Sequence, residues 1–139
     1  MRILSLLIFV ALSCQSQSNN SSSVKVISAD NSSEAVLNNK LVIDLLLEKE
    51  YQKITAGYFN KNLVQNLDAT KLKEVFLSLE SQMGKLQSFN ESYDINQDNY
   101  YQIYTEAVFD NGTFYLQLVF DNKNRISGFF IKPQLPKSL

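Results

Sequence analysis

The residue types of this 139-residue chain allow few kinds of chemistry. The chain contains one Cys and neither His nor Trp. Without His it cannot build a Ser-His or Cys-His nucleophile or a His-ligated metal site. One Cys cannot form an internal disulfide and cannot supply a Cys-rich zinc site. The groups left for chemistry are therefore this single thiol, the carboxylates and the tyrosines.

The single thiol, Cys14, follows a short apolar segment. Ile3 to Leu12 is ten residues long, whereas a membrane-spanning helix needs about 20, so we expect residues 1–13 to be a secretory signal peptide. The end of this segment, Ala11-Leu12-Ser13-Cys14, resembles the lipobox of bacterial lipoproteins, in which the Cys is acylated and becomes the first mature residue. An ordinary signal peptidase site is the alternative. We favour lipidation of Cys14 because it accounts for an otherwise unpaired thiol in an exported protein.

The composition changes sharply after Cys14. Gln15 to Ser23 consists only of Gln, Ser and Asn, which bury no apolar surface to offset chain entropy. We expect residues 14–30 to be the lipidated Cys and a flexible tether, in which Val24 to Ile27 is either linker or a short edge strand. The sequence thus predicts an exported protein, anchored to the bacterial cell envelope at the outer membrane or periplasmic face through acylated Cys14.

The charge of the predicted mature chain is nearly balanced. Removal of Arg2 with the signal peptide leaves 12 basic side chains against 14 acidic ones, and the Lys residues are scattered. Nucleic-acid binding needs clustered cations, so we exclude it as a function. The partners that remain are the membrane, reached through the acyl anchor, and a second copy or another envelope protein.

The first half of the folded part contains three predicted helices. The first runs from an Asn31 cap, with Glu34 three residues later, to about Lys49. The second covers Glu50 to Tyr58, and the third begins after a cap at Asp68 and ends at Gly84. Their apolar residues recur at helical spacing and are expected to face the core. These residues are Val36, Leu37, Leu41, Val42, Leu45, Leu46, Tyr51, Ile54, Tyr58, Leu72, Val75, Phe76, Leu79 and Met83.

Beyond Gly84 the apolar residues alternate, which is typical of strands. We expect strands over residues 85–95, 101–109, 114–120 and 125–132. Asn111-Gly112 predicts a type I′ hairpin between the second and third strands. Helices followed by an antiparallel meander predict an α+β domain over residues 31–139, with N-terminal helices packed on one face of a curved four-stranded sheet. The inward-facing positions are Tyr101, Ile103, Ala107, Phe109, Phe114, Leu116, Leu118 and Phe120.

The stretch from Leu79 to Pro133 resembles a bacterial family called domain of unknown function 3887. The similarity lies in LESQMGKLQSF, YYQIYTEAVFDNGTFYLQLVFD and RISGFFIKP, with Gly84, Phe120-Asp121 and Gly128 as its most specific positions. The resemblance implies a fold similar to nuclear transport factor 2 and the cystatins, a curved sheet wrapped by helices. It also implies a secreted or lipid-anchored protein, here a stand-alone lipoprotein.

The alternation leaves a polar and aromatic face on the predicted sheet, opposite the apolar face. Such a face can bind a sugar, a peptide or a second subunit, because Tyr combines apolar area with a hydroxyl group at little entropic cost. Alternatively, its cross-strand pairs only stabilise the hairpin. The candidate binding residues are Tyr100, Gln102, Tyr104, Glu106, Tyr115 and Gln117.

Two motifs fall short of a chemical site. The implied fold supports isomerases that pair a carboxylate base with a Tyr donor, as Tyr104 and Glu106 could, but we expect their face to point away from the helices. Asp94 to Asp98 opens like a calcium loop, yet Asn99 and Thr105 stand where such a loop needs Gly and Glu. We therefore predict no enzymatic activity, no metal and no cofactor.

The sequence thus predicts a lipid-anchored envelope protein whose domain acts by binding or self-association. The alternative is a carrier or sensor of a small apolar ligand, held in a pocket between the helices and the sheet. Apolar residues at these spacings are also what an ordinary filled core contains. The candidate pocket residues are Phe76, Met83, Phe109, Phe114 and Phe129.

Overall fold

The computed structural model of the chain describes residues 29–97 and 100–137. The predicted signal peptide, Cys14 and nearly all of the tether lie outside these residues, as does Asp98 of the calcium-like motif. Four helices come first: α1 (Ala29–Leu47), α2 (Tyr51–Gly57), α3 (Lys61–Asn66) and α4 (Ala69–Met83). Four strands follow: β1 (Leu86–Gln97), β2 (Tyr100–Phe109), β3 (Gly112–Phe120) and β4 (Ile126–Lys132).

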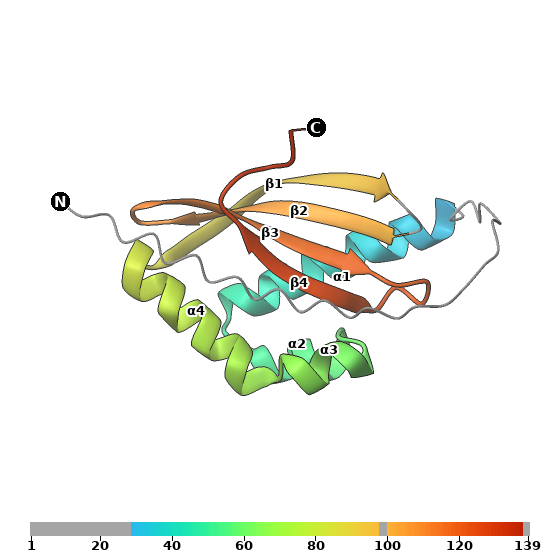
Figure 1. The fold of residues 1–139 in the computed structure, drawn as a ribbon, viewed down its shortest axis with the longest axis horizontal. Coiled ribbons are helices and arrows are strands. Elements are labelled where there is room, and N and C mark those ends of the chain that lie inside the picture. The colour runs from blue at the N-terminus through green and yellow to red at the C-terminus, as the bar shows by residue number, and fades with distance from the viewer. Residues whose placement is uncertain (1–28, 98–99, 138–139) are drawn as a thin grey trace.

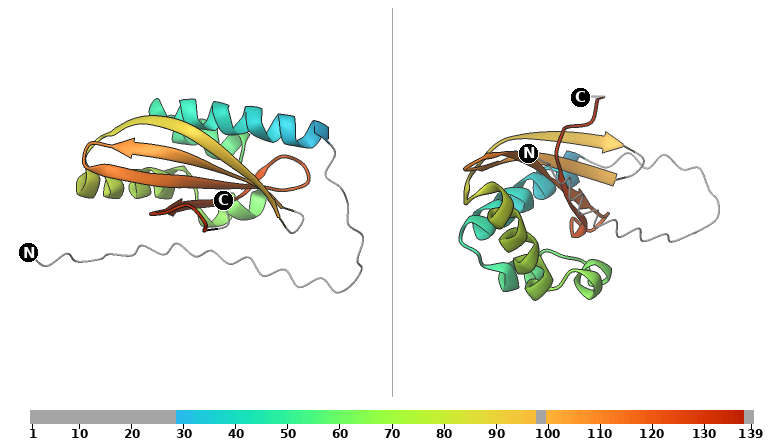
Figure 2. Two further views of the ribbon diagram at one scale, coloured as in Figure 1. Left: turned by 90° about the horizontal axis from the view of Figure 1, so that it is seen from above. Right: turned by 60° about the vertical axis from the view of Figure 1, so that its left-hand side comes forward.

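The strands form one twisted antiparallel sheet in the order β1-β2-β3-β4. The helices lie on one side of this sheet, with α1 behind the strands and α2 to α4 below them (Figures 1 and 2). Within the described residues, the opposite side of the sheet carries no helix, and we call it the outer face. The predicted α+β architecture is therefore confirmed. No helix in the described ranges is long and apolar enough to cross a membrane.

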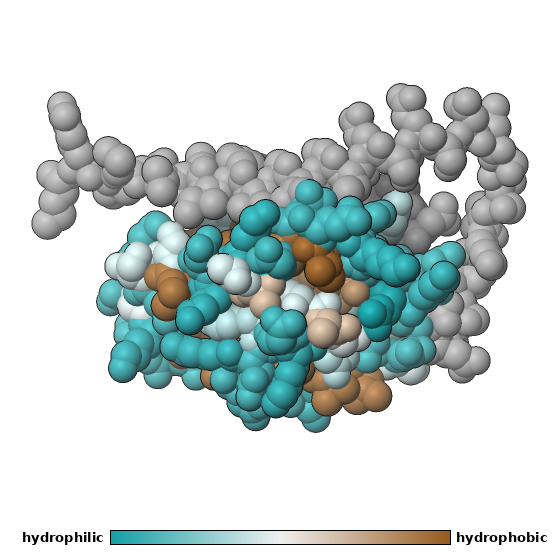
Figure 3. Space-filling view, turned by 90° about the horizontal axis from the view of Figure 1, so that it is seen from below, coloured by the Kyte–Doolittle hydropathy of each residue, from teal (hydrophilic) through white to brown (hydrophobic). Residues whose placement is uncertain are grey.

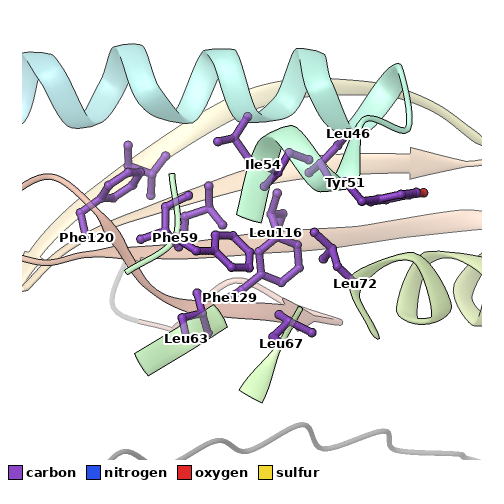
Figure 4. Packing of buried hydrophobic residues seen from close by; sticks show 14 of the residues in the cluster. Leu46, Tyr51, Ile54, Phe59, Leu63, Leu67, Leu72, Leu116, Phe120 and Phe129 are labelled. Carbon is purple, nitrogen blue, oxygen red and sulfur yellow. The ribbon is translucent and has the colours of Figure 1, made fainter. Parts of the chain in front are cut away.

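The core lies between the sheet and the helices and is filled largely by aromatic rings. Phe129 of β4 contacts Phe59 and Phe76, with ring centroids 5.9 and 6.2 Å apart, and Phe76 in turn contacts Tyr51 at 6.1 Å. Figure 4 shows Phe59 and Phe129 side by side, close to Leu116 of β3. Burying each of these large side chains contributes about 1.5–3 kcal/mol to stability.

The buried face of α1 differs from the predicted one. Val36, Leu37 and Leu41, which we expected in the core, are 52%, 55% and 39% exposed. The residues that α1 buries completely or almost completely are Ala35, Asn39, Val42 and Leu46. Hydrophobic spacing misses this face because two of its four positions hold a small residue and an amide. The helix also begins at Ala29, so Asn31 lies inside it and is not its cap.

The short helix α3 was not predicted. Asn60 caps it, because its side chain accepts a hydrogen bond from the Leu63 N–H at 2.9 Å. The same side chain donates to Asp121 Oδ2 at 3.3 Å in the turn between β3 and β4. Phe59 forms an isolated parallel bridge with Ile126, the first residue of β4. This bridge and the Asn60 hydrogen bond fasten the α2–α3 connection to the start of β4.

The β2–β3 hairpin forms where expected, but its turn is not type I′. Phe109 pairs with Gly112, so the loop consists of Asp110 and Asn111. Neither of these has the positive φ that a type I′ turn requires. Their backbone N–H groups donate to the carbonyls of Lys85 and Met83 at 3.0 and 2.9 Å. These contacts with the end of α4 hold the turn, overriding its local preference.

Gly84 allows the chain to pass from α4 into β1 beside this turn. Its φ is 78°, as expected for a helix terminator, although its ψ of −172° is extended. A Cβ at this position would lie 2.5 Å from the Cβ of Asp110. Gly57, at the end of α2, has no atom within 4 Å of the corresponding position.

We predict opposite effects of alanine at these two glycines. Gly84→Ala should lower the free energy of unfolding by about 2 kcal/mol, because the new methyl group meets Asp110 and the φ is strained. Gly57→Ala should raise it by about 0.5 kcal/mol, because it only restricts the unfolded chain. Urea denaturation measures both values, and equal effects would contradict this account of the junction.

Candidate functional site

The structure places the six predicted surface residues together on the outer face. Tyr100, Gln102, Tyr104 and Glu106 alternate along β2 with the inward-facing Tyr101, Ile103, Thr105 and Ala107. Register pairs Tyr104 with Gln117 and Glu106 with Tyr115 on β3. The alternation in the sequence therefore located this face correctly.

The six residues differ in how much of each is accessible. Tyr100 is 50% exposed, whereas Tyr104 and Gln117 are only 6% and 8% exposed. Gln102 holds both of these side chains: its Oε1 accepts a hydrogen bond from Gln117 Nε2 at 2.7 Å and another from the Tyr104 hydroxyl at 3.4 Å. Burial also raises the pKa of the Tyr104 phenol. Tyr104 and Gln117 are therefore nearly inaccessible to a partner, whereas Tyr100 and half-buried Tyr115 can contact one.

Several apolar residues of the outer face were missed by the sequence analysis. Tyr93 of β1 lies beside Tyr104, and Phe130 of β4 lies beside Gln117, so one row crosses all four strands. Ile95 and Val119 flank Gln102 in the next row. All four are half-buried. Alternation along β1 and β4 could have identified them, had the register across the sheet been known.

The Tyr104 and Glu106 pair is engaged in other contacts on this face. Glu106 Oε2 accepts from Asn90 Nδ2 at 3.3 Å, and Tyr104 donates to Gln102. Both lie on the side of the sheet away from the helices. In the described ranges, no three His, Cys, Asp or Glu side chains gather in a way that could hold a metal ion.

The five predicted pocket residues lie in two packed clusters. Phe76 and Phe129 belong to the main core and contact each other edge to face. Phe109 and Phe114 form a separate perpendicular pair with centroids 6.1 Å apart. Met83 lies beside Gly112, at the hairpin end of the sheet. Each of these side chains thus packs against protein atoms instead of lining one shared space.

A groove of about 490 Å³ lies instead at the flank of α1, over β1 and β2. Val36, Lys40 and Ile43 line it from α1, and Phe89 and Ile103 line it from the strands. It also has polar lining, provided by Asn39, Asp44, Asn90, Ser92 and Asp94. The sequence analysis did not find this groove, because its walls come from α1 and from strands that follow much later in the chain.

A hydrogen-bonded chain lies beside the groove. Asn39 Nδ2 donates to Thr105 Oγ1 at 3.2 Å, and Thr105 Oγ1 is 2.9 Å from Ser92 Oγ. Asn39 is 4% exposed and Thr105 is fully buried. The other polar atom of the amide, Asn39 Oδ1, is buried and has no hydrogen-bond partner among the described residues. Such atoms are rare in folded proteins, where nearly all buried polar groups are paired.

Tyr101 and Asp94 form a second polar contact near the groove. The Tyr101 hydroxyl donates to Asp94 Oδ2 at 3.0 Å. Burial, this hydrogen bond and the negative charge of Asp94 together raise the pKa of Tyr101 to about 12. Tyr101 is therefore a proton donor to Asp94 throughout the physiological range.

These observations define a small α+β domain with a partly apolar outer face and a mixed groove at its flank. Comparison with protein families matches residues 40–129 to the family described as Protein of unknown function (DUF3887). This match spans well over half of the chain, which belongs to that family. The resemblance noted from the sequence is thereby confirmed. Neither the curated proteins nor the solved structures compared with the chain include a match.

We predict that the Tyr101 phenol ionises at a higher pH than an ordinary tyrosine. Tyr101→Phe should remove an absorbance step near pH 12 from the phenolate titration of the folded protein. Removal of a step near pH 10 would contradict the Asp94 contact. Because the unfolded phenol ionises first, the stability due to this contact is complete below about pH 10 and is lost as the pH rises towards 12.

Proposed function

We propose that this chain is a lipid-anchored protein of the bacterial cell envelope whose folded domain associates with another protein, without catalysis. The proposed contact surface is the outer face, and the partner is a second copy of the chain or another envelope protein. The anchor would be the acylated Cys14, joined by the tether to α1, which begins at Ala29 and so includes the last two residues of the predicted tether. This proposal combines the sequence features of the N-terminus with the geometry of the sheet.

The observation that carries the proposal is the outer face itself. Half-buried Tyr93, Tyr115, Val119 and Phe130 come from β1, β3 and β4, and no described helix covers them. Tyr and Phe are the residue types most enriched at protein interfaces, because each supplies a large contact area with few rotatable bonds. Contiguous apolar area of this kind on a soluble domain commonly marks a binding surface.

The side of the molecule formed by α2 to α4 offers a weaker surface for association. Seen from below, over α2 to α4, it is mostly hydrophilic with separate hydrophobic spots (Figure 3). Exposed apolar residues scattered singly are normal on protein surfaces and need no partner. The outer face differs because some of its apolar side chains lie together: Phe130 and Val119 both lie beside Gly128, and Tyr93 pairs with Tyr104.

The outer face is suited to binding because its polar groups are organised in advance. Gln102 orients Tyr104 and Gln117, and Lys132 Nζ lies 5.3 Å from the centre of the Phe130 ring. Side chains that are already fixed lose little entropy when a partner binds. The same contacts argue against catalysis, because Tyr104 and Glu106 are held by Gln102 and Asn90 and do not face each other across a substrate space.

We predict that a partner can be trapped at the outer face in living cells. A photo-crosslinking phenylalanine analogue placed at Tyr115 should give a discrete adduct on irradiation of intact bacteria. The matched control is the same analogue at Leu37, which is 55% exposed on α1. An adduct with twice the mass of the chain identifies self-association, and another mass identifies a different envelope protein. Equal crosslinking at both positions, or none at Tyr115, would contradict the proposal.

We also predict that the anchor depends on Cys14. Cys14→Ser should abolish incorporation of radioactive palmitate and release the protein from the membrane fraction, because the thiol is the acylated group. Ser13→Ala keeps a small residue before the Cys and should leave labelling unchanged. Palmitate labelling that persists in Cys14→Ser would disprove the lipoprotein assignment.

A further inference from the structure

The groove between α1 and β1 has the dimensions of a small-molecule site. Its volume of about 490 Å³ falls within the range of about 300–1,000 Å³ that is typical of such sites. Phe89, Ser92 and Asp94 of its lining pair with inward-facing residues of β2, so the groove lies on the helical side of the sheet. Asn90 also lines it but reaches Glu106 of the outer face. An inference about the groove therefore goes beyond the proposed function and does not depend on it.

Asn39 gives the groove an unsatisfied hydrogen-bond acceptor. Its amide is held at one end by Thr105, while Oδ1 is buried without a donor. The Thr105 and Ser92 hydroxyls are 2.9 Å apart and either can donate to the other, but neither forms a hydrogen bond with Asn39 Oδ1. A molecule that brings an N–H group to this position would complete the hydrogen bonding of the amide.

The charges around the groove favour a cationic donor over an anionic one. Two carboxylates, Asp44 and Asp94, line it against one ammonium group, Lys40. Both carboxylates are exposed, and Asp94 already holds one hydrogen bond, from Tyr101. Within the described residues, neither Lys40 nor Asp44 takes part in an ion pair or a hydrogen bond between side chains. The charge of Asp44 is thus not neutralised by a neighbour.

The remaining walls would hold an apolar body. Val36 is 52% exposed and Ile43 is half-buried on α1, and they face Phe89 and Ile103 across the groove. A chain of several methylene groups or a small ring would cover these side chains and remove them from water. This arrangement also gives a reason why α1 exposes Val36.

We propose that this groove binds a small amine with an apolar body, whose N–H group donates to Asn39 Oδ1 and whose charge lies near Asp44 and Asp94. The apolar body packs between Val36 and Ile43 on one side and Phe89 on the other. A carboxylate with the same body is rejected, because it brings no donor to Asn39 and is repelled by both aspartates.

Titration of the ¹⁵N-labelled full chain with n-hexylamine at neutral pH tests this proposal, with hexanoate as the matched probe. Hexylamine should shift the amide signals of groove residues on α1 and β1 in a saturable way, whereas hexanoate should leave them unchanged. Equal shifts with both probes, or shifts confined to residues outside the groove, would overturn the proposal.

Three variants separate the site from general charge effects. Asp44→Asn should weaken hexylamine binding about threefold, the effect expected of one exposed charge. Glu48→Gln makes the same change one turn later on an exposed residue outside the groove lining, and should leave binding unchanged. Asn39→Leu should abolish saturable binding, and the Asp44 comparison decides the question if that variant does not fold. Equal weakening by Asp44→Asn and Glu48→Gln would also overturn the proposal.

Discussion

The buried core packs the helices on one face of the sheet, and two aspartates fix where the ends of the strands meet the helical layer. Each follows the same Val-Phe pair, in the repeated tetrapeptide VFDN at the ends of β2 and β3. Asp110 Oδ2 accepts from the Lys85 N–H at 2.7 Å, where α4 passes into β1. Asp121 accepts from the Arg125 N–H at 3.0 Å and from Asn60 at 3.3 Å, where α3 begins. Hydrogen bonds from N–H groups to a carboxylate are stronger than neutral ones. Asp110 and, through Asn60, Asp121 tie strand ends to helix ends, while the core holds the helices on one face and leaves the outer face open.

Local patterns in the sequence predicted the helices and strands that pack a single regular face on the core. Alternation located β2 and β3, and the apolar spacing between Asp68 and Gly84 located α4, because each packs one regular face on the core. The helix α3 was missed although Asn60, followed by Leu63 and Leu67, is a readable cap and apolar pair. The turn type after β2 could not be predicted locally, since the contacts that hold it come from the end of α4.

Local patterns predict one candidate surface better than the other, because the second depends on contacts between distant parts of the sequence. The outer face follows from alternation within two neighbouring strands, so Tyr100 and Tyr115 were found from the sequence. The burial of Tyr104 depends on flanking strands and on Gln102, and was not predictable. Asn39 and Thr105 are 66 residues apart. The role of Asn39 among the apolar residues of α1 therefore cannot be inferred from the sequence without that long-range contact.

We propose that the domain binds at two separate surfaces: a protein at the broad aromatic face and a ligand in the small groove. The central claim is that the outer face is covered in the envelope. Hydroxyl-radical footprinting of intact cells, compared with the purified protein at high dilution, tests it most directly. The account predicts that Tyr115 and Phe130 are oxidised several-fold less in cells, while exposed Leu37 and Leu41 of α1 are oxidised equally in both. Equal oxidation of Tyr115 and Phe130 in both samples would contradict it.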